Sequence, residues 1–219
     1  MPRLKQQPLA TAHPRAREYY EKLFHGRCPV EHPGTDSGSP GHWWTTIALR
    51  PYVFDHAADH LKMYGLFAEG SVSELDKQVR EIAITRTGYV VGSQFVYSQH
   101  CKAMRRTGLT DAHVAGIPSW AVSDIWTPAQ RVILAYTDAV VYGLGRAPDG
   151  VFEELRRLHT DEDIVELTYH ITGYMLHATF CKALRLEFDD VPERVVEVPV
   201  PPGKDLEAFA TLHGVDRRP

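Results

Sequence analysis

Signals that begin and end helices recur along most of this 219-residue chain. Pro51 stands at the start of one helical pattern, and Thr127 with Pro128 stands at the start of another. Thr160 with Asp163 resembles a capping box that opens a third, long pattern. Between these signals, apolar residues recur at steps of three or four, as on one face of a helix. Strand patterns are nearly absent, so the sequence predicts an all-α fold.

Proline and glycine divide the chain into three regions. Residues 1–42 are expected to hold a first amphipathic helix and then a loop over 26–42 that is rich in glycine and proline. Long ordered loops often cover sites. Residues 43–190 form the predicted helical domain. Residues 191–219 form an extended, proline-rich tail, with a last short helix expected over 205–213.

The composition argues against several classes of protein. The formal net charge is −4, which disfavours a nucleic-acid-binding protein with a basic face. No run of about 18 apolar residues is present to span a membrane, and the first residues lack the apolar stretch of a secretory signal. Three cysteines make no disulfide framework. We therefore expect a cytoplasmic protein without nucleic-acid or membrane partners.

Two segments of the chain resemble each other. In both, a glutamate stands six residues before Thr-Gly-Tyr, and a Cys-Lys-Ala follows later in the chain. The first copy holds Glu81, 87–89 and 101–103, and the second holds Glu166, 172–174 and 181–183. The pattern predicts an internal duplication of a helical unit. Chance similarity between two amphipathic helices is the alternative.

The stretch from residue 92 to residue 101 holds the clearest candidate for chemistry. If this stretch is helical, one face carries Ser93, Val96, Tyr97, His100 and Met104. That face is largely apolar, so His100 is expected to be partly buried. A neutral imidazole in such a place can take or give a proton near pH 7. A core histidine bonded to a backbone carbonyl is the alternative.

Residues 80–117 resemble a segment of the carboxymuconolactone decarboxylase family. The matching residues are Arg80, Glu81, Gly92, Phe95, Tyr97, Gln99, His100, Arg105, Gly108, Leu109 and Thr110. The resemblance extends over roughly residues 43–190. It implies a helical bundle like that of alkylhydroperoxidase D (AhpD), assembled as a homo-oligomer that is a dimer, trimer or hexamer.

The peroxidase branch of this superfamily uses a C-x-x-C-x-x-x-H pattern, with a glutamate twelve residues before the first cysteine. Here the two cysteine positions hold Ser93 and Val96, whereas the histidine and glutamate positions hold His100 and Glu81. Serine and valine cannot form a disulfide or a sulfenic acid. The resemblance therefore implies an acid–base pair without dithiol peroxidase chemistry.

Two cysteines occupy equivalent places in the two similar segments. Cys101 is expected to act as a small buried hydrophobe. It would be a reactive thiol only beside a basic group that lowers its pKa. The sequence leaves open whether Cys101 and Cys181 approach each other in the folded protein.

The decarboxylase branch matches the chain better and implies roles for particular residues. Loss of CO2 needs a cation for the carboxylate, a donor for the developing enolate oxygen and an acid that protonates carbon. His100 is expected to be the proton donor or oxyanion partner, and Glu81 is expected to orient it. Arg86 or Arg105 is expected to bind the carboxylate. A structural ion pair for Glu81 and a solvated helix surface for the arginines are the alternatives.

Further substrate contacts are expected from Ser93, Tyr97 and Trp44. The Trp43-Trp44 pair follows the loop over 26–42 and forms either a lid over an apolar ligand or part of the core. Because Val96 stands where many family members have glutamate, the site is expected to be less acidic than theirs. Lactone hydrolysis, hydration or isomerisation is therefore an alternative reaction, and non-catalytic binding of a small molecule is another.

Other histidines are weaker candidates. His56 and His60 share a helix face at a spacing that can bind metal, but no third ligand is indicated, so we expect no metal site. Glu166 and His170 form a similar pair four residues apart, with His177 two turns further on. These residues either line a pocket or make contacts within the helix or at an interface. The expected acid–base chemistry needs no cofactor.

Overall fold

The computed structural model describes residues 2–64, 72–186 and 193–195. Regular structure within these ranges is helical and contains no strand, so the prediction of an all-α fold is confirmed. The α-helices are α1 (Pro14–Phe24), α2 (His42–Ile47), α3 (Pro51–Leu61), α4 (Lys77–Val91), α5 (Gln94–Arg106), α6 (Asp111–Gly116), α7 (Pro128–Tyr142), α8 (Asp149–Leu158) and α9 (Asp161–Ala183). Short 3-10 turns are η1 (Leu9–Thr11), η2 (Lys62–Tyr64) and η3 (Trp120–Val122).

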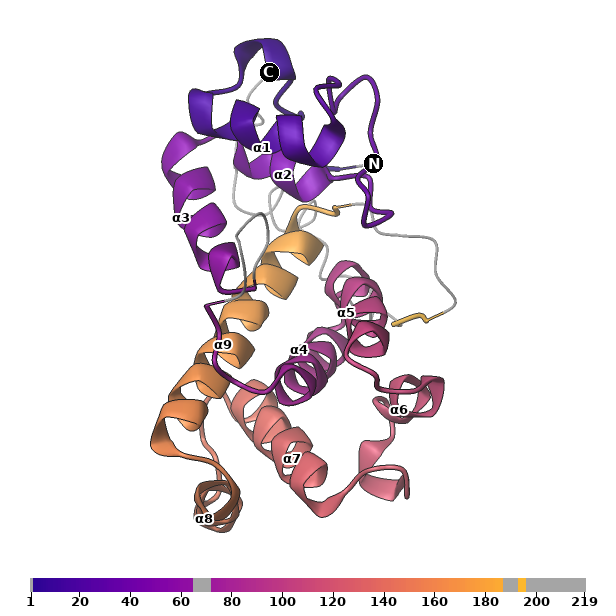
Figure 1. Cartoon of the computed structure of the whole chain (residues 1–219), viewed down its shortest axis with the longest axis vertical. Coiled ribbons are helices and arrows are strands. Elements are labelled where there is room, and N and C mark those ends of the chain that lie inside the picture. The colour runs from indigo at the N-terminus through magenta and orange to yellow at the C-terminus, as the bar shows by residue number, and fades with distance from the viewer. Residues whose placement is uncertain (1, 65–71, 187–192, 196–219) are drawn as a thin grey trace, which may run out of the picture.

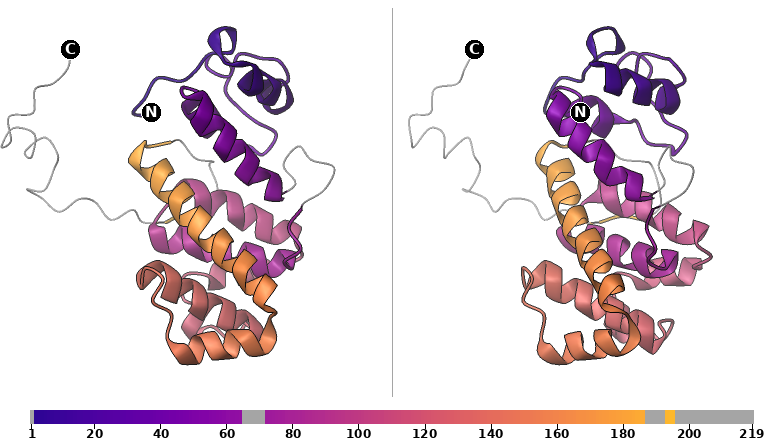
Figure 2. Two further views of the ribbon diagram at one scale, coloured as in Figure 1. Left: turned by 90° about the vertical axis from the view of Figure 1, so that its left-hand side faces the viewer. Right: turned by 60° about the vertical axis from the view of Figure 1, so that its left-hand side comes forward.

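The long helix α9 connects two groups of helices (Figures 1 and 2). Helices α1, α2 and α3 lie at one end of the molecule, α7 and α8 lie toward the other, and α4 and α5 lie between them. Helix α4 packs against α5, α7 and α9, and its residues from Arg80 to Gly88 are all buried. A helix that is buried on every side must be surrounded by other elements, so α4 is the centre of the bundle.

Separate apolar cores stabilise the two ends. The main core surrounds α4 and includes Ile82, Leu134 and Ile171, each fully buried. A second core under α1 and α3 includes Tyr20 and Phe54 and reaches α9 at Cys181. Full burial of one large apolar side chain stabilises the fold by about 1.5–3 kcal/mol. These contacts hold the N-terminal helices against the bundle, and the space left between the two parts is where a pocket forms.

Two glycines explain how α4 and α5 meet. Gly92 has φ 72° at the C-terminal end of α4, a conformation that costs glycine little, and it turns the chain into α5. At Gly88, a Cβ atom would lie 2.9 Å from Val96 Cγ1 and 3.0 Å from the Tyr97 backbone nitrogen. The absent side chain therefore allows the two helices to pack closely.

The helix starts follow the predicted signals closely. Pro51 and Pro128 occupy the first turns of α3 and α7, and capping boxes at Thr127 and Thr160 are formed. Helix α4 begins at Lys77 because the Asp76 side chain accepts hydrogen bonds from the backbone N–H groups of the first turn. The local signals were therefore sufficient to place most helix boundaries.

The two similar segments have different geometries. The first copy is broken at Gly92 into α4 and α5, whereas the second is the uninterrupted helix α9. The internal duplication and the homo-oligomer therefore remain predictions, as does the division at residues 42 and 190. The short helix expected over 205–213, like most of the tail, lies outside the described residues.

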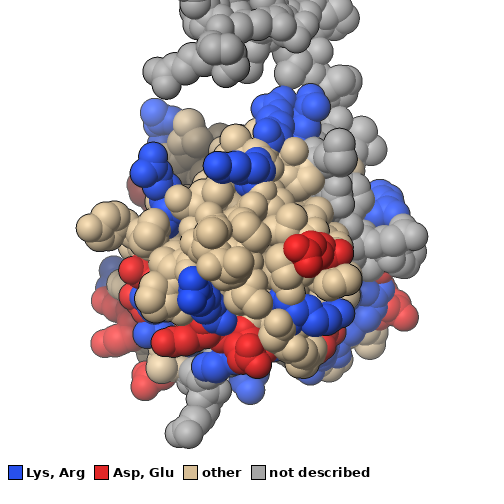
Figure 3. All heavy atoms as spheres, turned by 90° about the horizontal axis from the view of Figure 1, so that it is seen from above, with Lys and Arg blue, Asp and Glu red and all other residues tan. Residues whose placement is uncertain are grey.

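No helix in the described part of the chain is long and apolar enough to cross a membrane. The face seen from above in Figure 3 has a largely uncharged centre with lysines and arginines around it. Acidic side chains gather toward one edge of that view.

Candidate functional site

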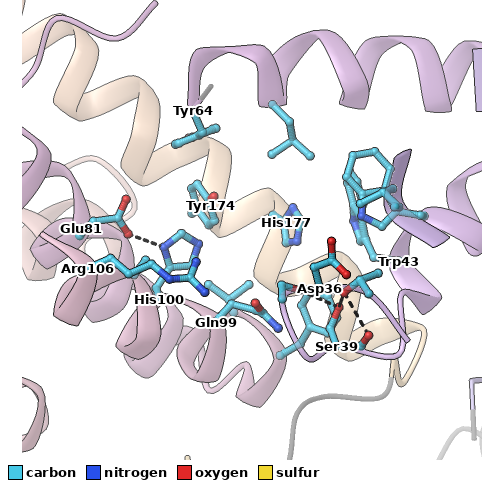
Figure 4. A pocket seen from close by; sticks show the side chains of 18 of the residues that line it. Asp36, Ser39, Trp43, Tyr64, Glu81, Gln99, His100, Arg106, Tyr174 and His177 are labelled. Atoms are coloured by element: carbon cyan, nitrogen blue, oxygen red, sulfur yellow. Dashed lines mark hydrogen bonds and ion pairs between the residues drawn. The ribbon is translucent and has the colours of Figure 1, made fainter. Parts of the chain in front are cut away.

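A cavity of about 680 Å³ lies between the N-terminal helices and the central bundle (Figure 4). Helices α4, α5 and α9 line one side, and α1, α2 and the loop over 35–39 line the other. The charged and aromatic residues around it include Lys22, Asp36, Trp43, Trp44, Tyr64, Lys77, Arg80, Glu81, Phe95, His100, Arg106, Tyr174 and His177. This volume is in the range of sites for small molecules.

A histidine and a glutamate form the polar centre of the cavity wall. His100 Nδ1 lies 2.7 Å from Glu81 Oε2. Both side chains are largely buried, with 13% and 6% of their surfaces exposed. Because α4 and α5 pack closely at Gly88, two residues 19 positions apart in the sequence meet here. The predicted approach of Glu81 to His100 is therefore present in the structure.

The charge on Glu81 fixes how this pair can exchange protons. Burial raises the pKa of Glu81, but the charges of His100 and Arg80 and their hydrogen bonds outweigh burial, so the pKa is lowered. An ionised carboxylate accepts, so Nδ1 of His100 donates its proton to Glu81. Nε2 of a neutral His100 then has a lone pair that can take a proton, and a protonated ring can give one.

Aromatic rings form the opposite part of the wall around His177. Its ring stacks on Trp43 with centroids 4.8 Å apart, and on Tyr174 and Phe95 at 5.6 and 5.9 Å. Burial, together with the charges of His100 and His60, lowers the pKa of His177 to about 3. His177 is therefore neutral near pH 7 and adds a flat, uncharged surface on which a planar ligand can stack.

The charged lining has more cations than anions. Lys22, Lys77, Arg80 and Arg106 line the cavity, and their acidic counterparts there are Asp36 and Glu81. Arg80 is buried and its Nε lies 3.2 Å from Glu81 Oε1, so it is committed to that carboxylate. Arg106 is exposed at the edge of the cavity, near His100 in Figure 4. An anionic ligand is favoured at such a rim.

Two arginines expected to bind substrate are directed elsewhere. Arg86 is buried and binds both carboxylate oxygens of Asp138, at 2.7 and 2.9 Å, as well as the carbonyl of Ile117. Arg105 pairs with Asp111 and Glu193. Neither lines the cavity. The prediction that they bind substrate is therefore wrong for this cavity: their charges hold helices and loops together, and Arg106 lies next to the pocket.

The expected single face of α5 is divided between two environments. Val96 and His100 line the cavity, whereas Tyr97 and Met104 belong to the main core. Ser93 is buried and caps α5 by accepting a hydrogen bond from Val96 N. Tyr97 and Ser93 are therefore not at the pocket surface, contrary to the prediction that they contact substrate.

The tryptophan pair is both pocket wall and core. Trp44 lines the cavity, as expected, and also packs against Tyr19 and Phe54. Trp43 stacks on His177. The pair is thus part of the core and part of the pocket wall, and its role as a lid stays a prediction.

The cysteines do not approach the arrangement that a dithiol needs. Cys101 belongs to the main core and Cys181 to the core under the N-terminal helices, and neither forms a disulfide. Burial raises the pKa of the Cys101 thiol to about 12 and raises that of Cys181 as well. Both thiols are therefore protonated near pH 7 and poorly reactive.

The histidine pair of α3 has two different surroundings. His60 packs against Gly173 and its Nδ1 lies 3.3 Å from the Tyr169 hydroxyl. His56 is exposed. Within the described ranges, no group of three or more histidine, cysteine, aspartate or glutamate side chains is arranged to hold a metal ion.

Of the lining residues, His177 was considered in the sequence analysis as lining a pocket, whereas Tyr64, Arg106 and Tyr174 were not. Tyr174 and His177 lie one turn apart on α9, a spacing that places them on one face, and the sequence therefore contained a signal for this pair. Tyr64 comes from η2 and Arg106 from the end of α5. Nothing local distinguishes Arg106 from Arg105, so only the orientation of α5 decides between them.

Comparison with known proteins agrees with this architecture. Residues 58–139 match the model of the carboxymuconolactone decarboxylase family. A search of curated proteins finds no significant match. This segment contains both Glu81 and His100.

Three solved structures have similar folds. A peroxidase-related protein from Ralstonia eutropha, described as an alkylhydroperoxidase AhpD core, has a TM-score of 0.67 at 18% identity over 86% of this chain and 93% of its own. A protein of unknown function from Agrobacterium tumefaciens, named for a suggested AhpD antioxidant role, has a TM-score of 0.54 at 23% identity over 69% and 97%. The debrominase Bmp8 in its apo form has a TM-score of 0.59 at 14% identity over 81% and 87%.

At these identities the solved structures establish the fold alone. The family match and the helical architecture agree with the resemblance that begins at Arg80 and Glu81. Residues 58–139 are therefore similar to the carboxymuconolactone decarboxylase family, and the described part of the chain has a helical fold like those of the AhpD-like structures.

Proposed function

We propose that this protein is a carboxymuconolactone decarboxylase-like enzyme that uses Glu81 and His100 for acid–base chemistry on a small carboxylated lactone or keto acid. The observation that carries the proposal is the 2.7 Å contact of His100 Nδ1 with Glu81 in the wall of a cavity with a cationic rim. An acid–base pair, a place for an anion and an apolar wall are the three parts that such a reaction needs.

The carboxylate of the substrate is bound at the cationic rim. Arg106 and Lys77 are exposed there, so they can meet the ligand without first giving up a buried partner. Binding must leave the carboxylate able to depart, which a solvated, exposed cation permits better than a buried bidentate pair. The flat ring of a conjugated substrate stacks on Trp43 and His177.

The reaction then needs one bond broken and one proton supplied. The carbon–carbon bond to the carboxylate breaks, CO2 departs, and the electron pair passes to the conjugated carbonyl oxygen as an enolate. In its protonated form His100 donates a hydrogen bond from Nε2–H to this oxygen, and it then gives that proton to carbon. Glu81 keeps the ring orientation fixed through Nδ1 and stabilises the imidazolium form.

The same pair supports related reactions, and the thiol alternative has no support here. Proton transfer by His100 also serves lactone opening, hydration or double-bond migration, so these remain alternative reactions at the same site. Ser93 and Val96 replace the cysteines of the peroxidase pattern, and Cys101 lies in a separate core from Cys181. A dithiol cycle is therefore not proposed.

The proposal is tested by incubating the protein with 4-carboxymuconolactone and a panel of β-keto and lactone acids, with CO2 release measured directly. The wild type is compared with His100→Asn, Glu81→Gln and the control His32→Asn, whose side chain is exposed. Loss of the acid–base group lowers kcat by about 10²–10⁴-fold, whereas the control remains active. If the wild type releases no CO2 from any of these acids, the decarboxylase assignment is wrong.

A second measurement addresses the other outcomes. NMR of the same mixtures detects ring opening, hydration or isomerisation without CO2, and dependence on His100 would then assign one of the alternative reactions. Arg106→Gln is compared with Arg105→Gln, a matched change one residue away and outside the cavity. We expect KM to rise in the first variant only. An equal rise in both would contradict the assignment of Arg106 to the carboxylate.

A further inference from the structure

A second histidine–glutamate pair lies behind the pocket wall. His170, on α9, is completely buried, with 0% of its surface exposed. Its Nδ1 lies 2.8 Å from the hydroxyl of Tyr64, and its Nε2 lies 3.1 Å from Glu166 Oε1. Both ring nitrogens are thus in hydrogen bonds, which satisfies the requirement for a buried imidazole. The ring is held between a residue of the pocket and a residue one turn earlier on the same face of α9.

The Tyr64 end of this arrangement opens into the pocket. Tyr64 and Tyr174 both line the cavity, and their rings meet edge to face with centroids 5.4 Å apart. The Tyr174 ring also contacts His100 edge to face, at 4.6 Å. Figure 4 shows Tyr64 and Tyr174 on the cavity side of α9, beside the pair of Glu81 and His100.

The Glu166 end reaches the protein surface. The Glu166 side chain is 19% exposed and lines a shallow surface hollow together with Val72 and Tyr169. Its Oε2 accepts hydrogen bonds from the backbone N–H groups of Glu74 and Leu75. Tyr64, His170 and Glu166 therefore form an unbroken series from the pocket to solvent, and α9 carries both histidine and glutamate.

We propose that Tyr64, His170 and Glu166 form a second proton-transfer path, which exchanges protons between the pocket and the surface without passing through Glu81 or His100. The inference rests on the proposed acid–base function of the pocket. Tyr64 is the end that meets the bound molecule, and His170 and Glu166 act through it as positioning and relay residues. The series thus resupplies or removes the proton that the chemistry in the pocket consumes or releases.

The resting direction of the hydrogen bonds follows from the charge on Glu166. Burial raises the pKa of Glu166, but interactions with Ser73, His170 and the Leu75 N–H outweigh burial and lower the pKa. The ionised carboxylate accepts from Nε2–H of His170, and Nδ1 therefore accepts from the Tyr64 hydroxyl. Burial also lowers the pKa of His170, so the ring is neutral near pH 7.

The transfer is balanced at each atom. When the Tyr64 oxygen takes a proton from the pocket, the original hydroxyl proton moves to Nδ1 of His170, and the Nε2 proton moves to Glu166. Each of Tyr64 and His170 gains one proton and loses one, and Glu166 becomes neutral until it loses its proton to water. The reverse sequence delivers a proton to the pocket. No oxidant, metal or further reactant is needed.

Charged groups from other helices face this series and set its pH range. Arg80, from α4, lies with its guanidinium 5.5 Å from the centroid of the Tyr64 ring. His60, from α3, and Arg80 both lower the pKa of His170, while Glu166 raises it. Arg80 also pairs with Glu81, so a change in the charge of one acid–base pair is felt by the other.

The test uses the full chain with Tyr64→Phe, which removes one oxygen and keeps the ring, and with Glu166→Gln. Tyr169→Phe is the matched control, because Tyr169 lies on α9 with Glu166, its hydroxyl contacts His60, and it is not part of the series. With an acid from the panel that the wild type converts, we expect kcat to fall about tenfold or more in Tyr64→Phe and Glu166→Gln. KM changes little, the solvent deuterium isotope effect becomes larger, and the pH profile of kcat changes shape. The control keeps the wild-type values.

A second readout does not need turnover. Nitrogen-15 NMR of the labelled protein identifies which ring nitrogen of His170 carries the proton, with His170→Gln used to assign the signals. We expect Nε2–H in the wild type, and a changed Nδ1 signal in Tyr64→Phe but not in Tyr169→Phe. A charged ring, or the Nδ1–H form, would overturn the path whatever the activity.

The two readouts separate the possible failures. If the tautomer is as expected but Tyr64→Phe and Glu166→Gln stay within twofold of wild-type kcat at every pH, the series is structural only and the proposal fails. If the wild type turns over none of the acids, the proposed function fails, and the His170 tautomer alone then decides whether the directed hydrogen-bond series stands.

Discussion

Replacing His177 with phenylalanine should make the stability of this protein less sensitive to acid. His177 has a pKa of about 3 in the folded protein, against about 6.5 for an unperturbed histidine. Between these values only the unfolded chain binds the proton, so the unfolded state is favoured as the pH falls below 6.5. The stability that the neutral ring confers is therefore present above pH 6.5 and is lost progressively toward pH 3.

The size of the effect follows from the two pKa values. Between pH 7 and pH 5, protonation of His177 in the unfolded state costs at most about 2 kcal/mol of unfolding free energy. His60 and His170, whose pKa values are also lowered, act in the same direction but are present in both proteins. Phenylalanine keeps a flat ring against Trp43 and does not titrate. The comparison between the proteins therefore isolates the one side chain.

Urea unfolding at pH 7 and at pH 5 measures the difference. We expect the wild type to lose about 2 kcal/mol more than His177→Phe over this range, with similar slopes against urea. His32→Phe, at an exposed position, is the control and should behave as the wild type does. If His177→Phe and the wild type lose equal stability to within about 0.5 kcal/mol, the stacked ring is not kept neutral by its surroundings and the reasoning is refuted.

Two further predictions concern buried groups outside the pocket. Arg86→Met should lower the unfolding free energy by about 3–5 kcal/mol, because the change leaves the partly buried Asp138 without its bidentate partner. Urea unfolding measures this loss. A loss below about 1 kcal/mol would show that the pair contributes no more than a surface ion pair. Cys28 should be alkylated by iodoacetamide well before Cys101 and Cys181, because it is partly exposed and backbone hydrogen bonds lower its pKa. Mass spectrometry of the native protein follows the labelling. Earlier labelling of Cys101 would contradict its place in the core.

The candidate site was only partly accessible from the sequence. His100 and Glu81 were found because the family pattern fixes their spacing, and the structure brings them to 2.7 Å. Arg86 and Arg105 were expected at the substrate because their positive charge fits a carboxylate. In the structure each of them instead forms an ion pair with an acidic side chain of the protein itself. The sequence pattern of a helix gives the relative directions of its side chains. Which residues contact each face of the helix depends on distant parts of the chain.

The assignment of α5 illustrates this limit. Spacing alone placed Val96, Tyr97 and His100 together, but about 100° separates successive residues, and the boundary between pocket and core falls between Val96 and Tyr97. In the same way, Arg106 lies on the pocket side of α5 and Arg105 does not. Of the path through His170, the sequence indicated only the pair of Glu166 and His170, four residues apart on one helix.

Local interactions were therefore enough to determine the helices of this protein, because caps, prolines and periodic apolar residues act within a few positions of each other. Asp76, Pro128 and Thr160 all begin helices by such contacts. The pocket was decided by the tertiary structure alone. It forms where α1 and α2 close over α4, α5 and α9, and only that packing sets Trp43 on His177 and Tyr64 on His170, across more than 100 residues of sequence.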